Sequence, residues 1–383
     1  MVLRRWTLRK GQVSRVACDA FFGAEDRNDG LPGGTADFLN APLRLVYGES
    51  MKRSPCVNLS LVNRPRADYC PASLAPGPSP VVYPMPELPE VETMRRGILG
   101  IVGSRIAGVE RVRCRRRPIL VEPPMPRFRS LAVGATVREI GRIGKRVVVH
   151  IDRPGSQAGK PGLRTAIVFE PRMTGLVLLA DPPTVEHLRF RITLAGGDVL
   201  ELLYWDRRGL GSVRLVAESE IAERYGNGSV GPDALEVSVD DIAERLSKSR
   251  RAIKVALLDQ RALAGVGNLY AAEILHLAKI HPARRCDELR PADWEQIHAA
   301  MREVLEAAIR YEGSTLSDGT YRNALNESGD YQKFHRVYDR EGEVCQRCGK
   351  ATIERIVQAQ RSTFFCPSCQ RLRPVRTATR TRR

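Results

Sequence analysis

Two closely spaced cysteine pairs constrain the fold of this chain more than any other feature. Two residues separate Cys345 from Cys348 and Cys366 from Cys369, and 17 residues lie between the pairs. This spacing is typical of four thiolates around one tetrahedral Zn²⁺ in a small ribbon or finger. A closed four-cysteine site has no open coordination position, so we expect a structural ion. A redox dithiol is the alternative, and it explains two evenly placed pairs less well.

The segment between the cysteine pairs predicts a β-hairpin over residues 351–365, with residues 358–362 near its tip. Arg361 is there either an ordinary solvated side chain or a group aimed at a phosphate. The other five of the nine cysteines are scattered, and we see no pattern of a secretory signal. This usage favours a reducing compartment over a disulfide framework.

The charge of the chain favours a polyanionic partner. Its 383 residues carry a formal net charge of +17, with a pI near 9.8. Nucleic acid is the simplest partner for such a charge, although charge alone also fits a basic protein without one. No apolar run approaches the ~18 residues that a membrane span needs, so we expect no membrane partner.

An internal methionine, Met85, precedes Pro86 and Glu87. A proline at the start of a chain carries a secondary amine, which can attack a carbonyl carbon, whereas a proline within a chain cannot. Residues 1–84 show no sustained helical or strand period. We interpret them as an N-terminal extension, due to a start assigned too early or to a segment that is removed; a transit peptide is the alternative.

After Met85 the pattern becomes regular. Pro89 suits the first turn of a helix. The apolar positions that follow form one stripe: Val91, Met94, Ile98 and Val102. Aliphatic runs then predict strands, which are residues 146–151, 165–169, 176–180, 190–194 and 199–205, the last two joined at Gly196-Gly197. We expect a β-sandwich with one leading helix over residues 85–217.

A helical period replaces the strand period beyond about residue 218. Ser238 resembles a helix start, helices at 253–258 and 269–277 flank a Gly-rich turn, and a longer helix begins at Pro291. Backbone N–H groups of that turn could bind a phosphate, or the turn could only join two helices. We expect four further segments: a linker (218–233), a helical domain (234–336), the zinc hairpin (337–371) and a basic tail (372–383).

In this order the motifs resemble those of the formamidopyrimidine-DNA glycosylase family, base-excision enzymes related to endonuclease VIII. Four motifs carry the resemblance: Met-Pro-Glu-Leu-Pro-Glu-Val-Glu (85–92), Ile-Lys-Val-Ala-Leu-Leu-Asp-Gln (253–260), Gly-Val-Gly-Asn-Leu-Tyr (265–270) and Gln-Arg-Ser-Thr-Phe-Phe-Cys (360–366). It covers residues 85–370 and implies a mixed α+β fold with a β-sandwich domain, a helix-two-turn-helix (H2TH) domain and a zinc finger. Leu88 and Val91 resemble the oxidised-purine branch.

The resemblance also implies catalytic roles. Pro86, freed from Met85, would attack C1′ of a damaged nucleotide and form a Schiff base, and Glu87 would move protons at the sugar. Lys145 corresponds to the lysine of β-elimination, and Arg361 to the zinc-finger arginine of δ-elimination.

DNA contacts are implied in the same way. The residues at or beside the family's DNA-binding positions are Met173, His187, Arg208, Arg250, Lys254 and Asn268. The chain departs from the family at three places. Gly209 replaces an arginine, and Leu210 replaces a phenylalanine. The family's histidine just before Met173 is absent, and Glu170 lies near its position. These departures put the lesion preference in question.

The sequence therefore predicts a monomeric DNA glycosylase/AP lyase of base excision repair that acts on double-stranded DNA. It would remove oxidised purines, cut the strand by β,δ-elimination, hold one structural Zn²⁺ and work in the cytoplasm on a bacterial nucleoid. One alternative is an endonuclease VIII-like enzyme for oxidised pyrimidines. The other is a non-catalytic protein that binds damaged DNA, if residues 1–84 are retained.

Overall fold

The computed structural model describes residues 85–153, 162–226 and 228–372, which belong to one structural unit. The predicted N-terminal extension (1–84) and the predicted basic tail from residue 373 on lie outside the described residues. None of the described helices is both long enough and apolar enough to cross a membrane.

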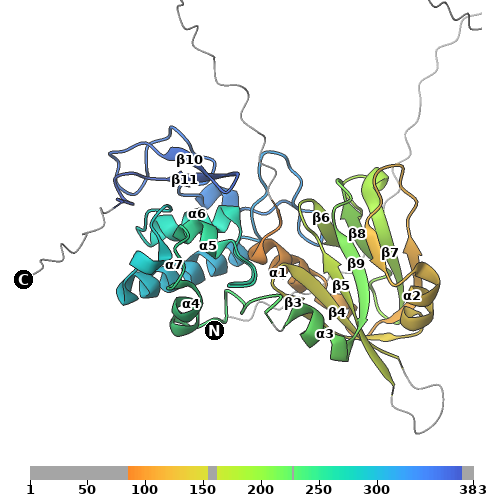
Figure 1. Cartoon of the computed structure of the whole chain (residues 1–383). Coiled ribbons are helices and arrows are strands. Elements are labelled where there is room, and N and C mark those ends of the chain that lie inside the picture. The colour runs from red at the N-terminus through yellow and green to blue at the C-terminus, as the bar shows by residue number, and fades with distance from the viewer. Residues whose placement is uncertain (1–84, 154–161, 227, 373–383) are drawn as a thin grey trace, which may run out of the picture. The chain divides into compact units, whose positions relative to one another are not determined.

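The first part of the described chain is built on a nine-stranded sheet (Figure 1). Its strands are β1 (Arg105–Arg111), β2 (Leu120–Glu122), β3 (Thr136–Ile143), β4 (Arg146–Arg153), β5 (Leu163–Glu170), β6 (Gly175–Leu178), β7 (Leu188–Ala195), β8 (Glu201–Asp206) and β9 (Ser212–Ala217). Their order is β2-β9-β5-β4-β3-β1-β7-β8-β6, and all pairs but β2–β9 are antiparallel. The hairpin predicted around Gly196-Gly197 is confirmed as β7–β8.

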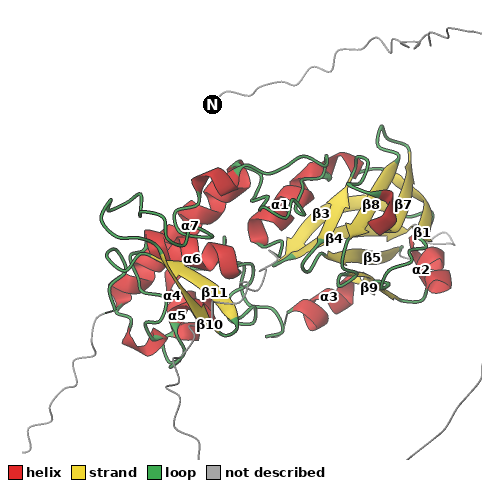
Figure 2. Cartoon of the chain, turned by 90° about the horizontal axis from the view of Figure 1, so that it is seen from above, coloured by secondary structure: helices red, strands yellow, loops and turns green. Residues whose placement is uncertain are grey.

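Helix α1 (Leu88–Gly97) lies between this sheet and the helical part of the chain (Figures 1 and 2). It contacts β3 and β4 and also β6, which is four places away from β3 in the strand order. Neighbouring strands are about 4.8 Å apart, so one helix reaches all three only if the sheet curves around it. The predicted sandwich domain thus takes the form of one curved, continuous sheet.

Two segments differ from the prediction. Val102 follows the 3₁₀ turn η1 (Leu99–Ile101) and is 45 % exposed, so the apolar stripe of α1 ends at Ile98. The first half of the predicted linker forms α3 (Glu218–Tyr225), because Tyr225 packs on the face of β4, β5 and β9 opposite α1. A short helix that the sequence pattern did not indicate, α2 (Met125–Ala132), contacts β1 and β2 and buries Phe128 edge-on to Phe190 of β7.

The helical domain is confirmed, with an N-cap at Ser238 whose Oγ accepts the Asp241 N–H at 3.1 Å. Its helices are α4 (Val239–Leu246), α5 (Ile253–Leu257), α6 (Asn268–Leu277) and α7 (Pro291–Arg310). Short 3₁₀ turns complete the described chain: η2 (Val185–His187), η3 (Cys286–Glu288) and η4 (Tyr331–Phe334). The buried apolar core of this domain includes Leu88 of α1 and Phe364 of the cysteine module.

The cysteine module contains the predicted hairpin, formed by β10 (Glu354–Gln358) and β11 (Arg361–Phe365). Ala359 and Gln360 join the strands with φ values of 46° and 60°, the left-handed backbone that a tight two-residue hairpin turn requires. Strand β11 packs against α6, so the hairpin tip points at the start of that helix.

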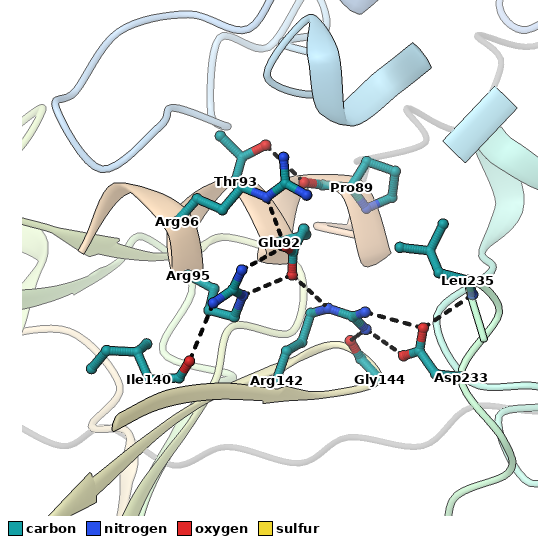
Figure 3. A network of polar contacts seen from close by, with 10 residues as sticks. All are labelled: Pro89, Glu92, Thr93, Arg95, Arg96, Ile140, Arg142, Gly144, Asp233 and Leu235. Atoms are coloured by element: carbon teal, nitrogen blue, oxygen red, sulfur yellow. Dashed lines mark hydrogen bonds and ion pairs between the residues drawn. The ribbon is translucent and has the colours of Figure 1, made fainter. Parts of the chain in front are cut away.

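Arg142, at the end of β3, joins the sheet, α1 and the helical domain (Figure 3). Its Nε donates to Glu92 of α1 at 3.1 Å, and its Nη2 donates to Asp233 at 3.0 Å. Burial raises the pKa of Glu92, but hydrogen bonds from Arg95, Arg96 and Arg142 outweigh it and hold that pKa at about 2. The β3–β4 turn, formed by Gly144 and Lys145, is therefore fixed relative to α1 and to the helical domain.

We predict that Arg142→Ala lowers the free energy of unfolding by about 3–5 kcal/mol, because it leaves two carboxylates without their buried partner. Arg191→Ala is the matched control, since Arg191 also pairs with two carboxylates but on the surface, and should cost less than about 1 kcal/mol. Urea unfolding of the two variants measures the difference. Equal effects would show that the Arg142 network contributes no more than a surface pair.

Candidate active site

A cavity of about 530 Å³ lies between the start of α1, the residues after β5 and β8, the start of α6 and the tip of the β10–β11 hairpin. This volume is in the range of ligand sites in proteins. Six of the residues predicted to act in catalysis or DNA binding line it: Pro86, Glu87, Met173, Arg208, Asn268 and Arg361. Segments far apart in the sequence therefore meet at one place.

The first turn of α1 positions Pro86 and Glu87. The Glu87 N–H donates to Oε2 of Glu90 at 2.9 Å, and the next N–H, of Leu88, donates to the Gly265 carbonyl at 3.0 Å. Glu87 and Leu88 are thereby held by the helix itself and by the Gly-rich turn of the helical domain, and Pro86 directly precedes them.

The carboxylate of Glu87 is bound at the N-terminus of α6. Its Oε1 accepts the N–H of Leu269 at 2.9 Å, and its Oε2 lies 3.4 Å from the N of Tyr270. A Cβ on Gly267 would lie 2.2 Å from the Glu87 carboxyl carbon, so only glycine fits there. These two N–H groups at the start of α6 are bonded to Glu87 and are not available to a phosphate.

Glu87 and Lys145 each shift the pKa of the other. Burial raises the pKa of Glu87, opposed by the positive charge of Lys145 and by N–H groups of the α6 turn. Burial lowers the pKa of Lys145, opposed by Glu87, while the charge of Arg361 lowers it further. Lys145 lies in the β3–β4 turn, three residues after Arg142. Burial therefore shifts both groups toward their neutral forms, and neighbouring groups perturbed in this way are suited to proton transfer.

Lys254 and Asn268 hold the tip of the cysteine hairpin. Nζ of Lys254 donates to Oδ1 of Asn268, and Nδ2 of Asn268 donates to the Ser362 carbonyl at 3.1 Å. Burial lowers the pKa of Lys254 to about 8, and nearby Arg361 adds to the shift. The position of Arg361 at the cavity thus depends on this contact between α5, α6 and β11.

The turn after β8 presents Arg208 beside Met173. The buried carboxylate of Asp206 accepts the N–H of Arg208 at 3.1 Å and that of Gly211 at 2.8 Å. Nη1 of Arg208 lies 3.2 Å from Sδ of Met173. Between them, Gly209 has φ 63°, and a Cβ there would lie 2.2 Å from the Arg117 carbonyl oxygen, which explains why no larger residue stands at this position.

Three predicted DNA contacts do not line the cavity: Lys254, which bonds to Asn268, and also His187 and Arg250. His187 ends η2 and packs edge-on against Trp205 with ring centroids 5.5 Å apart. Arg250 is exposed in the helical domain, near Asp287. The Glu170 carboxylate, near the position where the family has a histidine, is buried and paired with three arginines: Arg146, Arg172 and Arg214.

Sequence reasoning missed a buried polar group next to the cavity. Glu90 accepts hydrogen bonds from the Tyr270 hydroxyl and from the Ser314 N–H at 2.9 Å. Burial raises its pKa to about 7, and the charge of Glu87 adds to the rise. Glu90 lies three residues after Glu87, which is the spacing of a helix capping box, and this spacing could have indicated that Glu90 is bonded at the start of the helix.

The four cysteines are brought together as the spacing predicts. The Sγ atoms of Cys345, Cys348, Cys366 and Cys369 all lie within 4.8 Å of one another. Four thiolates at tetrahedral spacing fit one structural zinc ion. Cys345 and Cys366 also belong to the buried core of the helical domain, so metal binding stabilises the hairpin against α6.

We predict one zinc ion per chain and its loss in Cys348→Ala or Cys369→Ala. Cys114→Ala, which changes a cysteine outside the cluster, should keep the ion. Elemental analysis of the purified chains measures the zinc-to-protein ratio. A zinc-free wild-type chain, or full zinc in the cluster variants, would contradict the assignment.

We predict that the stability contribution of Glu90 falls as pH rises. Its pKa in the folded chain, about 7, lies above its ordinary value of 4.5, so the folded state binds the proton more tightly between these pH values. Replacing the group by glutamine removes the titration. Relative to Glu90→Gln, the wild-type chain should lose up to about 3 kcal/mol of unfolding free energy between pH 4 and pH 8.

Urea unfolding at a series of pH values tests this. Glu110→Gln, on the exposed surface, controls for the loss of one negative charge. Parallel pH profiles for wild type and Glu90→Gln would exclude the proposed shift.

Comparison with known proteins places these features in one family. Residues 85–213 match the formamidopyrimidine-DNA glycosylase N-terminal domain, residues 230–320 its H2TH domain, and residues 342–372 the zinc finger found in FPG and IleRS. The formamidopyrimidine-DNA glycosylase of Chloroflexus aurantiacus is 38 % identical over 289 residues, which are 75 % of this chain and 98 % of that protein. The Bacillus subtilis protein of that name is 36 % identical over 292 residues, 75 % of this chain and 99 % of its own.

Solved structures of proteins from the same family are also similar to this chain. The Lactococcus lactis Fpg in complex with DNA containing an abasic site is 32 % identical, with a TM-score of 0.64, and the match covers 75 % of this chain and all of that one. The MutM (FPG) protein of Thermus thermophilus is 34 % identical, with a TM-score of 0.63, over 76 % of this chain and all of that one. The chain therefore belongs to the formamidopyrimidine-DNA glycosylase family.

Proposed function

We propose that this chain is a bifunctional DNA glycosylase/AP lyase of base excision repair. Its substrate is double-stranded DNA that contains oxidised purines, such as 8-oxoguanine and formamidopyrimidines, or abasic sites. The observation that carries the proposal is the placement of Pro86 and Glu87 in the wall of a cavity that Arg361 also lines, with Lys145 beside Glu87. The names of the relatives and the DNA in the Lactococcus lactis complex support it.

We propose that the working chain begins at Pro86. The match to the N-terminal family model starts at residue 85, and three quarters of this chain align with 98 % of the Chloroflexus aurantiacus relative. With Met85 removed, the Pro86 nitrogen is a secondary amine. A free α-amine has a pKa near 8 in model peptides, so part of it is unprotonated at neutral pH.

The first chemical step is attack of the Pro86 nitrogen on C1′ of the damaged nucleotide. The base must leave the duplex stack first, because C1′ is otherwise out of reach. As the N–C1′ bond forms, the glycosidic bond breaks, and the base leaves with its electron pair and takes up a proton. The proline nitrogen loses its proton, the C1′–O4′ bond then breaks with O4′ taking up a proton, and the opened sugar is joined to Pro86 as a Schiff base.

Glu87 is suited to protonate the opening sugar ring, because burial raises its pKa and so favours the protonated carboxyl more than in water. Lys145 is suited to accept a proton for β-elimination, because burial lowers its pKa and so favours the neutral amine more than in water. Arg361 at the hairpin tip is suited to stabilise the departing phosphate in δ-elimination. The two eliminations cut the strand on both sides of the lost sugar.

Binding of the flipped-out nucleotide falls to the groups around the cavity. Met173 and Arg208 would fill the space left in the duplex, and Leu210, beside Gly209, adds an apolar side chain there. Asn268 and Lys254 would act on DNA mainly by fixing the hairpin tip. His187 and Arg250 would contact the backbone on either side.

The zinc ion has no part in the chemistry of this scheme, since the four-cysteine set leaves no open position. We propose that the enzyme acts as a monomer, since one chain supplies every group named above. Its relatives are bacterial, which supports a place in the cytoplasm on the nucleoid.

The proposal is tested by borohydride trapping on a duplex that contains 8-oxoguanine. A chain that starts at Pro86 should give a covalent adduct of protein and DNA, because borohydride reduces the Schiff base. A chain that keeps Met85 uncleaved should give none, because its Pro86 nitrogen is an amide. Arg361→Ala should still give the adduct, but its reaction should stop after β-elimination, without the second cut of the strand.

A Pro86 chain that binds the duplex but never gives an adduct would refute the enzyme and favour a DNA-binding protein. A parallel duplex with an oxidised pyrimidine separates the endonuclease VIII-like alternative. Preferred cleavage of that duplex would correct the substrate class and keep the mechanism.

A further inference from the structure

The connection between β1 and β2 contains a run of arginines without a role in the proposed chemistry. Residues 113–117 read Arg-Cys-Arg-Arg-Arg and are called the arginine loop here. All four of its arginine side chains are exposed, while Cys114 is half-buried.

Most of this positive charge is not neutralised within the described chain. Arg116 pairs with Glu186 at 3.1 Å, and both side chains are more than half exposed. Among the described residues, no carboxylate lies within ion-pair distance of Arg113, Arg115 or Arg117. Three exposed guanidinium groups on five residues repel one another unless an anion lies between them.

The backbone of the arginine loop is nevertheless held firmly at its base. The Cys114 thiol donates to the Glu186 carbonyl at 3.1 Å and accepts from Nη1 of Arg189. Arg189 is 1 % exposed and also donates to the Asp206 carbonyl at 2.7 Å. Val112, just before the loop, donates its N–H to the Arg189 carbonyl at 3.0 Å. The arginines are thus presented from a fixed base.

This base places the arginine loop between two predicted DNA contacts. On one side the loop contacts Glu186, the neighbour of His187. On the other side the Arg117 carbonyl lies against Gly209, the neighbour of Arg208, which lines the cavity. The loop therefore continues the basic wall of the cavity outward.

We infer that the arginine loop binds backbone phosphates of the DNA duplex beside the lesion. The inference rests on the proposed function, because it takes DNA as the partner of the neighbouring cavity. Guanidinium groups bind phosphate oxygens in a bidentate manner, and such contacts position the duplex without reading its sequence. The loop should set affinity and its dependence on salt, and leave the choice of lesion to the cavity.

The test is a salt series of dissociation constants for the full chain on a duplex with a tetrahydrofuran abasic analogue, which binds without being cleaved. Each phosphate contact contributes about 0.9 to the slope of log affinity against log salt. The triple variant Arg113→Ala, Arg115→Ala, Arg117→Ala should therefore give a slope shallower by roughly 2–3. At 0.1 M salt its affinity should be lower by on the order of 100-fold.

A matched control removes three exposed arginines at the opposite end of the sheet: Arg105, Arg127 and Arg164. Their triple replacement by alanine should leave the slope unchanged. Replacing the loop arginines by lysine should restore most of the slope, since a lysine still offers one charge per phosphate. Thermal unfolding of all variants shows whether the loop variant stays folded.

An unchanged slope in the loop variant, or an equal loss in the control variant, would overturn the inference. Trapping of the wild-type chain reports separately on the proposed function. If trapping fails while the loop variant still shows its shallower slope, the loop binds DNA and the enzyme mechanism is wrong. If trapping succeeds and the slopes are equal, the mechanism stands and the loop has no part in binding.

Discussion

The structure depends on one carboxylate. Glu87 belongs to the first turn of the sheet domain's helix, yet its hydrogen-bond donors are the first N–H groups of α6 in the helical domain. A helix N-terminus favours negative charge, so this contact joins the two domains through the same group that faces the cavity. The glycines at 265 and 267 are needed because Leu88 and Glu87 occupy the space that side chains would fill.

Two further contacts fix the positions of Lys145 and Arg361 relative to that carboxylate. Arg142 ties the turn that carries Lys145 to α1 and to Asp233, so the lysine cannot move without the helix that carries Glu87. Asn268 and Lys254 hold the backbone next to Arg361. The cavity is therefore assembled from three parts of the chain, each fixed by buried hydrogen bonds to a neighbouring part. Such support is what places reacting groups with the accuracy that catalysis requires.

The sequence predicted much of this and missed what depends on long-range contacts. The cysteine spacing predicted the metal cluster and its hairpin, and apolar periods located most helices and strands, because those signals are local. The strand order, the curvature of the sheet and α2 were not predicted, since pairing partners leave no mark in a single sequence. Glu90 and Arg142 look like ordinary surface charges in the sequence, and only burial reveals their contacts. The structure explains two departures from the family. The Arg117 carbonyl leaves no room for a side chain at Gly209. Glu170 forms ion pairs with three arginines.

The carbonyl of Ser362 gives the cysteine cluster an influence beyond its own fold. This oxygen accepts hydrogen bonds from Lys254 of α5 and Asn268 of α6, which attach the hairpin to the helical domain. The four thiolates hold the two ends of the hairpin together. In the proposed scheme, base removal needs only Pro86 and Glu87, whereas the final strand cut needs Arg361 on the hairpin. Loss of the zinc ion would therefore release the segment that carries Arg361, the group assigned to the final strand cut. A metal that touches no substrate would decide how far the repair reaction proceeds.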